Sequence, residues 1–296
     1  MFSVITPTYN RAHTLHRVFE SLQKQTDKSF HWIVIDDAST DNTADLINTF
    51  KNTTTDFEIA YHKMESNMGK PDALNFGFQF CKEPITIIAD SDDSFAENTI
   101  ADLKAIWNLA NRSENGARIA TVWTLVEDEN NNVVGERFPY DFWQTDLNDR
   151  LLQKNGAVEG EKWHSWRTEV LRDAKMFTCK GSYVGESATW HKINLNYDFL
   201  SLNIIHRKYY QSLDGYIQSK KPLEKTALTH IYTSFYQLRD VSFIHILKYK
   251  YYRDLAFEYI KYKIRLRRNE KWLGLSKELM AIFVSCIITL KKLLGL

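Results

Sequence analysis

The chain contains few cysteines and almost no net charge. Its 296 residues include three cysteines, which are widely spaced and form no Cys-x-x-Cys pair. An odd number of isolated cysteines indicates neither a disulfide framework nor a zinc site. The net charge of +1 provides no overall attraction to a polyanion, so we expect no nucleic-acid partner.

Targeting and membrane-spanning signals are also missing. The N-terminus enters an apolar, strand-like run at Phe2, without a basic region or a cleavable apolar segment, so secretion is not expected. One uncharged run, Leu279–Leu290, is shorter than the roughly 20 apolar residues of an ordinary transmembrane helix. These absences predict a cytoplasmic location, and peripheral attachment to the inner face of the plasma membrane stays open.

The first half of the chain instead alternates strand-like and helix-like segments. Short apolar runs predict strands at residues 2–6, 32–35, 57–61, 85–89 and 118–126. Apolar residues at helical spacing predict helices near residues 15–22, 44–50, 71–80 and 100–110. This order predicts an α/β fold with a mostly parallel sheet and helices on both faces.

Polar clusters follow three of these strands, at Pro7–Asn10, Asp36–Asp37 and Asp90–Asp93. Such sheets bind ligands beyond the carboxyl ends of their strands, so three clusters at strand ends favour one binding crevice. Crowded carboxylates repel one another, and hard divalent cations that neutralise them often share their oxygen ligands with substrate phosphates. An acidic, solvated turn capping the next helix is the alternative for the last cluster taken alone.

Four segments resemble, in order and in spacing, the signatures of family 2 glycosyltransferases, which have the GT-A fold. They are Val4–Arg11, Val34–Thr43, Asn67–Asn75 and the D-x-D sequence Asp90-Ser91-Asp92. The close resemblance covers roughly residues 2–126. It implies an inverting enzyme of the bacterial surface-polysaccharide type. Such an enzyme moves a sugar from a nucleotide-sugar, UDP-type favoured, to a saccharide or a polyprenyl-linked saccharide.

The resemblance also implies roles for the donor-binding residues. Tyr9, after Pro7, would lie against the base, because an aromatic or proline face suits a flat ring. Asp37 would accept the N–H of a uracil-type ring, and Asp90 would contact the ribose or support the site. Lys70 would place a point charge on the diphosphate. A solvated lysine at a helix start is the alternative for Lys70.

The same resemblance implies a metal at the acidic cluster. Asp92 and Asp93 would hold Mn²⁺ or Mg²⁺, which neutralises the leaving diphosphate. Which of these two carboxylates, or Asp90, is the direct ligand stays open.

The base that takes the acceptor's proton is predicted at Glu186. The family commonly has Glu-Asp at this helix start, and here Ser187 replaces the Asp. Glu186 with Trp190 resembles the family's Glu-x-x-x-Trp variant. A first-turn carboxylate without catalytic role is the alternative for Glu186, and Asp173 and Asp198 are weaker candidates for the base.

Two other functions are weighed against this prediction. A sugar nucleotidyltransferase would need a glycine-rich loop after the first strand, where this chain has Pro7–Asn10. A catalytically inactive GT-A scaffold stays open because of the missing Asp after Glu186.

The predicted catalytic domain spans residues 1–215, and residues 216–296 form a helical, basic tail. Lys248–Lys271 holds nine basic and three acidic residues. An apolar and aromatic stripe recurs there at spacings of three or four: Tyr249, Tyr252, Leu255, Tyr259, Tyr262 and Leu266. Either this stripe packs onto the catalytic domain, or it docks onto anionic lipid.

Overall fold

The computed structural model describes residues 1–152, 158–211, 222–267 and 270–295. The chain divides into two units. Unit 1 comprises Met1–Asp146, Val158–Met176 and Asn196–Ser219, and unit 2 comprises Leu147–Ala157, Phe177–Leu195 and Lys220–Leu296. The predicted domain boundary between residues 215 and 216 lies outside the described residues, so it stays a prediction.

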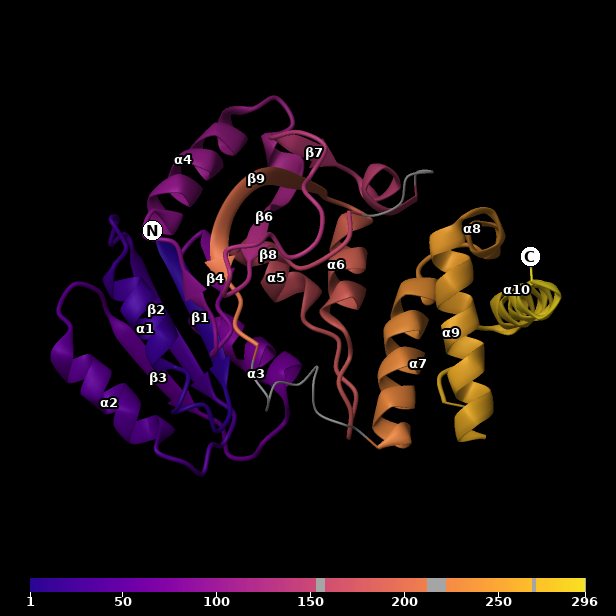
Figure 1. Cartoon of the computed structure of the whole chain (residues 1–296), viewed down its shortest axis with the longest axis horizontal. Helices are drawn as coiled ribbons and strands as arrows, with labels where there is room; N and C mark the ends of the chain where they lie inside the picture. Colours follow the sequence, from indigo (N-terminus) through magenta and orange to yellow (C-terminus); the bar gives the residue numbers. More distant parts are fainter. Residues whose placement is uncertain (153–157, 212–221, 268–269, 296) are drawn as a thin grey trace. The chain divides into compact units, whose positions relative to one another are not determined.

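Unit 1 is built on a nine-stranded sheet in which β9 curves over β6 and β8 (Figure 1). The strand order is β3-β2-β1-β4-β8-β6-β9-β5, and β7 pairs with β9. The strands are β1 (Phe2–Thr8), β2 (Phe30–Asp36), β3 (Ile59–Lys63), β4 (Ile85–Ile88), β5 (Ser94–Phe95), β6 (Ile119–Glu127), β7 (Trp143–Thr145), β8 (Lys162–Arg167) and β9 (Asp198–Lys208). The first four in the order are parallel, as are β6 and β9, so β1, β2 and β4 end at the same edge.

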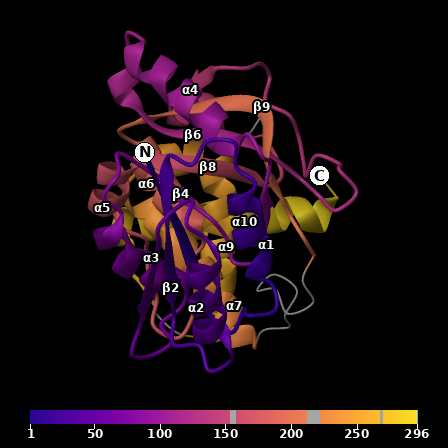
Figure 2. The ribbon, with the colours of Figure 1, turned by 90° about the vertical axis from the view of Figure 1, so that its left-hand side faces the viewer.

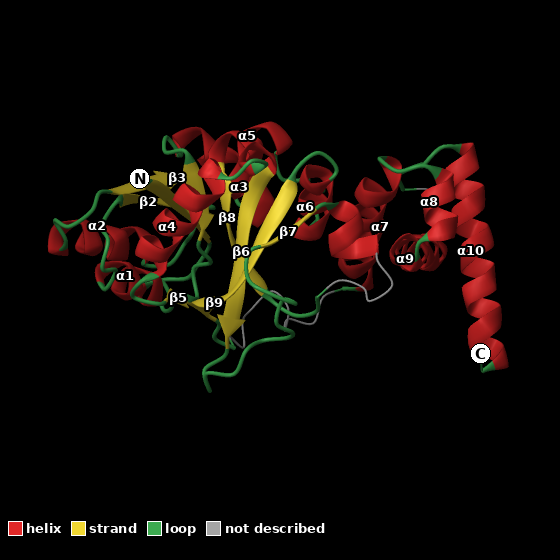
Figure 3. Cartoon of the chain, turned by 90° about the horizontal axis from the view of Figure 1, so that it is seen from above, coloured by secondary structure: helices red, strands yellow, loops and turns green. Residues whose placement is uncertain are grey.

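Helices cover both faces of this sheet, as predicted. They are α1 (His16–Gln23), α2 (Thr43–Thr53), α3 (Lys70–Gly77), α4 (Thr99–Arg112) and α5 (Thr168–Ala174). Successive strand residues point to opposite faces. Val4 and Trp32 therefore join a core with α1, α2 and α4, whereas Ile5 and Ile35 meet α3 on the other side. In Figures 2 and 3, α1 and α5 lie on opposite sides of the strands.

The strands and helices predicted over the first half of the chain are confirmed, with shifts at their ends. The third strand begins at Ile59, two residues later than predicted. The helix predicted to reach residue 80 ends at Gly77, and a 3₁₀ turn, Phe78–Phe80, completes it. Helix ends are the least sharply specified part of such patterns.

Unit 2 is helical, with α6 (Glu186–Asn194), α7 (Leu223–Arg239), α8 (Phe243–Lys248), α9 (Lys250–Leu266) and α10 (Leu275–Leu294). Tyr252, Tyr259 and Tyr262 of the predicted stripe are buried in a core shared with α7 and α10. The stripe therefore packs within unit 2. Among the helices that the structure describes, none combines the length and apolar character that crossing a membrane requires.

A buried ion pair fixes α10 against α9. Lys263 Nζ lies 2.6 Å from Glu278 Oε1, and both side chains are less than a tenth exposed. The Tyr259 hydroxyl donates to the second oxygen of Glu278 at 3.0 Å. Separating a buried ion pair leaves an unpaired charge in the interior, which is costly. This contact therefore fixes how α10 is rotated about its axis.

Gly77 lets α3 lie directly on the sheet. A Cβ there would lie 2.4 Å from Ile5 Cδ1 and 2.6 Å from Ile35 Cγ1. Overpacking a core costs about 1–3 kcal/mol, and alanine regains roughly 1 kcal/mol over glycine in a helix. We expect Gly77→Ala to lower the free energy of unfolding in urea by up to about 2 kcal/mol.

The matched variant is Gly77→Ala combined with Ile5→Val, which removes the clashing Cδ1 atom. Its loss of stability should be smaller than the sum of the two single losses. Strictly additive losses would show that the Cβ is accommodated in another way.

Candidate active site at the strand ends of unit 1

The loops that follow β1 and β2 are tied together by hydrogen bonds. The Asn10 backbone N–H donates to Ser39 Oγ at 2.9 Å, and Asn10 Oδ1 accepts the N–H of Thr40 at 2.8 Å. Asn10 and Ala38 both have positive φ angles, 53° and 64°. Such strained backbone outside glycine persists only where surrounding contacts hold it, and it clusters at functional sites.

The predicted donor-binding residues at these two ends differ in exposure. Pro7 is buried inside β1, whereas Tyr9 is 44% exposed just beyond it. Asp37 is buried, and its two carboxylate oxygens accept the backbone N–H groups of Met68 and Gly69, each at 2.7 Å. Burial raises the pKa of Asp37, and these hydrogen bonds only partly offset that rise. Asp37 thereby holds the loop that leads into α3.

Lys70 is the first residue of α3, and it turns toward the acidic cluster. Its Nζ lies 2.6 Å from Asp90 Oδ1. Burial alone would raise the pKa of Asp90, but the charges of Lys70 and Arg207 overcome this and lower it to about 2. Asp90 is therefore a carboxylate at neutral pH, held by two cations.

Arg207, near the end of β9, is the second cation. Its Nε lies 2.5 Å from Asp93 Oδ2, and its Nη2 lies 3.7 Å from Asp90 Oδ2. Both partners of the first contact are at most 9% exposed. Burial raises the pKa of Asp93 to about 7; Arg207 opposes this rise, and the charges of Asp90 and Asp92 add to it.

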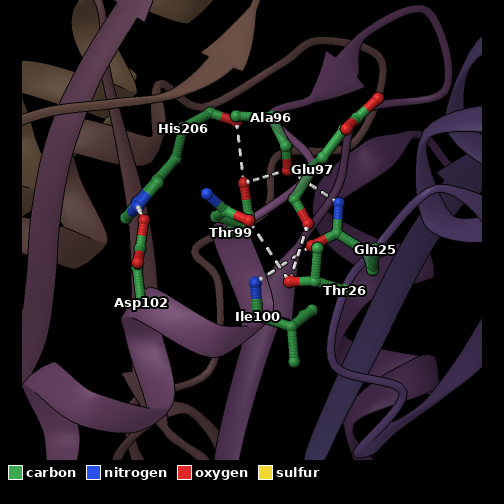
Figure 4. A network of polar contacts seen from close by, with 9 residues as sticks. Gln25, Thr26, Ala96, Glu97, Thr99, Ile100, Asp102 and His206 are labelled. Carbon is green, nitrogen blue, oxygen red and sulfur yellow. Dashed lines mark hydrogen bonds and ion pairs between the residues drawn. The ribbon is translucent and has the colours of Figure 1, made fainter.

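The residue before Arg207 is anchored in a polar network (Figure 4). The His206 carbonyl accepts the Ala96 N–H at 3.0 Å and the Thr99 hydroxyl at 3.3 Å. Its ring Nε2 lies 3.4 Å from Asp102 Oδ2. These contacts join the end of β9 to the start of α4, so the backbone that carries Arg207 has little freedom to shift.

Asp92 is the third carboxylate of the cluster, and neither Lys70 nor Arg207 forms an ion pair with it. It makes no ion pair within the parts of the chain that the structure describes, and it is partly buried. Burial, together with the charge of Asp90, raises its pKa, and the charges of Arg11, Arg207 and Lys70 offset that rise only in part. Its loop is fixed from α1, because Arg17 Nη1 donates to the Asp92 carbonyl at 3.1 Å and Thr14 Oγ1 donates to the Ser91 carbonyl at 3.0 Å.

This arrangement fits a divalent metal that completes its coordination with substrate. In the described ranges, no three His, Cys, Asp or Glu side chains converge as a ready-made metal site. Mg²⁺ is usually held by one or two carboxylates plus substrate phosphates, so Asp92 alone meets that need. Asp93 is engaged with Arg207, and its predicted role as a ligand stays a prediction.

Glu186, the predicted base, belongs to unit 2, where it is the first residue of α6. The preceding Gly185 N–H donates to Thr233 Oγ1 of α7 at 2.9 Å, which fixes the start of this helix. Asp198 is less suited to be a base: it is paired with Arg118 at 3.0 Å and lies at the end of β9 away from Arg207. Asp173 is exposed near the end of α5.

The sequence reasoning missed Arg207, although a signal was present. His206, Arg207 and Lys208 follow an apolar run within β9, so they repeat the pattern of polar residues at a strand end. The strands predicted from the sequence end at residue 126, so β9 and the polar residues at its end were not assigned. A strand that joins the sheet from residue 198 onward brings the cation to the carboxylates.

A family model described as glycosyl transferase family 2 matches residues 3–173. Among curated relatives, glycosyltransferase GlyG of Streptococcus pneumoniae is 33% identical over 103 residues, 35% of this chain and 34% of its own length. The poly(ribitol-phosphate) beta-N-acetylglucosaminyltransferase TarP of Staphylococcus aureus is 34% identical over 106 residues, 34% of this chain and 31% of its own length. The alignments thus span about a third of these relatives.

Solved structures of low identity share the fold. S. aureus TarS 1–349, in complex with UDP-GlcNAc, superposes with a TM-score of 0.62 at 17% identity, covering 99% of this chain and 92% of that one. The mannosyltransferase PcManGT from Pyrobaculum calidifontis, with GDP-Man and Mn²⁺, gives 0.52 at 16% identity, covering 98% and 74%. The predicted GT-A fold is confirmed.

Arg207→Ala tests the cation that holds the acidic cluster. Breaking a buried ion pair costs about 3–5 kcal/mol, because the other charge stays behind unpaired. The loss should be smaller at about pH 5 than at about pH 8, since a carboxyl whose pKa is raised in the folded state destabilises it only where ionised. Urea unfolding at the two pH values measures both effects.

The control is Arg118→Ala, which removes another arginine–aspartate pair, at the opposite end of β9, but one whose arginine side chain is 56% exposed. Its effect should be small and nearly independent of pH. Equal losses for the two variants would contradict the role of Arg207.

Proposed function

We propose a reaction for this chain on one premise: it belongs to glycosyl transferase family 2 and is a glycosyltransferase. In this reaction a sugar moves from a nucleotide-sugar, with UDP favoured, to a hydroxyl of a saccharide or a polyprenyl-linked saccharide. The observation that carries the proposal is Asp92, which makes no ion pair within the described residues and lies beside two aspartates that do. Structures of TarS with UDP-GlcNAc and with UDP support the choice of nucleotide.

The donor would lie across the ends of β1, β2 and β4. Tyr9, beyond Pro7, offers an exposed ring to the base. Each Asp37 oxygen accepts one backbone N–H and keeps further acceptor capacity for the N–H of a uracil ring. Lys70, set by its contact with Asp90, supplies positive charge to the diphosphate. The second Asp90 oxygen, 3.7 Å from Arg207 Nη2, would keep acceptor capacity for the ribose.

Mn²⁺ or Mg²⁺ would be held by Asp92 together with the donor's diphosphate. Once bound, the ion would offset the charge that develops on the leaving diphosphate. PcManGT and GalNAc-T7, two structures of similar fold, contain Mn²⁺. Lys70 and Arg207 form ion pairs with Asp90 and Asp93, which supports Asp92 as the ligand offered to the ion.

Transfer would proceed by direct displacement with inversion. The acceptor oxygen forms a bond to the anomeric carbon as the bond from that carbon to the diphosphate breaks. Glu186 takes the hydroxyl proton, as its position at the start of α6 and the resemblance of Glu186 and Trp190 to the Glu-x-x-x-Trp pattern support. A polyprenyl-linked acceptor is embedded in lipid, so this acceptor class goes with a peripheral membrane contact.

A screen of nucleotide-sugars tests the donor and the metal together. We expect hydrolysis or transfer with a UDP-sugar in the presence of Mn²⁺ and its loss with excess chelator. Asp92→Asn should abolish turnover while leaving the thermal unfolding transition in place, because its carboxylate pairs with no cation in the described chain.

Asp45→Asn, which alters an exposed carboxylate of α2, is the control and should retain full turnover. Undiminished activity in chelator would refute the metal assignment. If none of the nucleotide-sugars in the screen is hydrolysed or transferred, the proposed reaction is contradicted.

Glu186→Gln should reduce turnover by about 10²–10⁴-fold, the usual effect of losing a general base. Affinity for UDP in the presence of Mn²⁺ should be unchanged, since a base acts on the acceptor in the transition state. Glu169→Gln, the same substitution at an exposed position of α5, is the matched control. If Asp173→Asn or Asp198→Asn removes turnover and Glu186→Gln does not, the base is misassigned.

A further inference from the structure

The side of α10 that faces away from the core of unit 2 carries large, solvent-exposed apolar side chains. Six of them are between 38% and 67% exposed: Leu275, Leu279, Ile282, Phe283, Ile287 and Leu290. Apart from the adjacent Ile282 and Phe283, they follow one another at spacings of three or four residues, which places them along one stripe of the helix. We call this stripe the apolar face of α10. No charged residue occurs between Leu279 and Leu290, so the face is uninterrupted over that length.

This face cannot turn inward, because the opposite side of α10 is already packed. Ala281 and Val284 are buried in the core of unit 2, and Ser285 Oγ donates to the Ala256 carbonyl of α9 at 3.4 Å. The Lys263–Glu278 pair fixes the same side. Rotating α10 would expose that core and separate a buried ion pair.

The charge around the apolar face indicates what covers it. Residues 248–296 contain twelve basic and four acidic residues, a net charge of +8, so the rest of the chain carries −7. Lys291 and Lys292 are exposed immediately beyond the apolar run, and Trp272, 53% exposed, precedes α10. An apolar helix face with lysines and a tryptophan at its ends is the pattern of helices that lie in a membrane interface.

A second copy of this chain is a poorer partner for the same face. Pairing two such faces would bring two segments of charge +8 together, and that repulsion acts over about a Debye length of 8–10 Å. An anionic lipid surface instead attracts the basic residues while its acyl region takes up the leucines. Both a second copy and a lipid surface could cover the apolar face, but the positive charge favours the anionic lipid surface.

From these observations we infer that α10 is an interfacial anchor that docks on anionic lipid through its apolar face. The helix lies in the plane of the surface and does not cross it. The site differs from the tyrosine stripe of α9, whose side chains are used up in packing. The biological purpose of this anchor rests on the proposed function, in which the acceptor is lipid-linked. Lipid binding itself is measured without any sugar transfer.

The test is co-sedimentation of the full chain with vesicles of phosphatidylcholine and phosphatidylglycerol in equal parts. We expect binding that weakens as salt is raised and that is at least about tenfold weaker on pure phosphatidylcholine. The variant Leu279→Asp with Leu290→Asp should bind at least about tenfold more weakly than the native chain, since two leucines that would enter the acyl region are replaced by anions.

The matched control is Leu109→Asp with Leu223→Asp. These leucines are 57% and 56% exposed, against 57% for both Leu279 and Leu290, and they lie on α4 and α7. The control adds the same charge and should bind as the native chain does. UDP binding with Mn²⁺ and the thermal transition are recorded for every variant, so a failed donor site and a failed anchor are told apart.

A second variant, Lys291→Gln with Lys292→Gln, leaves the apolar face intact and keeps the test informative should the leucine variant fail to fold. It should reduce binding to anionic vesicles and reduce its salt dependence. The inference is overturned if the native chain does not bind anionic vesicles, or if the leucine variant and its control bind equally. It is also overturned if the native chain forms a dimer that only the Leu279→Asp, Leu290→Asp variant loses.

Discussion

The carboxylates that follow β4 are held in place by two cations, and the site is organised around that neutralisation. Three aspartates within four residues would repel one another strongly in a partly buried setting. Lys70 comes from the start of α3 and Arg207 from the end of β9, so one charge precedes the cluster in the sequence and the other follows it. Their effect is selective, because Asp90 and Asp93 form ion pairs with them, whereas the Asp92 carboxylate forms none in the described part of the chain.

Much of the surrounding structure serves to keep those cations in position. Asp37 holds the loop before α3 through two backbone N–H groups, so a carboxylate at the end of β2 governs where Lys70 begins its helix. Gly77 lets that helix lie on the sheet. The network of His206 and Thr99 does the equivalent for Arg207. Rigid support of this kind lets charged groups be arranged before substrate binds.

In unit 2, contacts between helices likewise decide which side chains are used for packing and which stay at the surface. Its aromatic stripe on α9 is consumed by packing, and one buried ion pair decides which side of α10 faces inward. The exposed side is then a consequence of the packed side. A basic amphipathic sequence thus holds two apolar stripes, and only the tertiary contacts distinguish the one that builds the core from the one left at the surface.

The sequence by itself determined the α/β order of residues 2–126, the strand-end positions of Pro7, Tyr9, Asp37 and the acidic cluster, and the position of Lys70 at a helix start. These features are local: strand and helix periodicity is written in neighbouring residues, and parallel strands place their ends at one edge. The family motifs lie in the same part of the chain and could be recognised in order.

The tertiary structure decided what depends on contacts between distant residues. Arg207 meets Asp93 across 114 positions of sequence, and no local pattern specifies that pairing. Likewise, the sequence left open which of Asp90, Asp92 and Asp93 ligates the metal directly, and only the tertiary structure shows which of them are paired with the two cations. The same holds for α10, because periodicity shows that a helix is apolar, whereas burial by its neighbours shows which of its sides remains exposed.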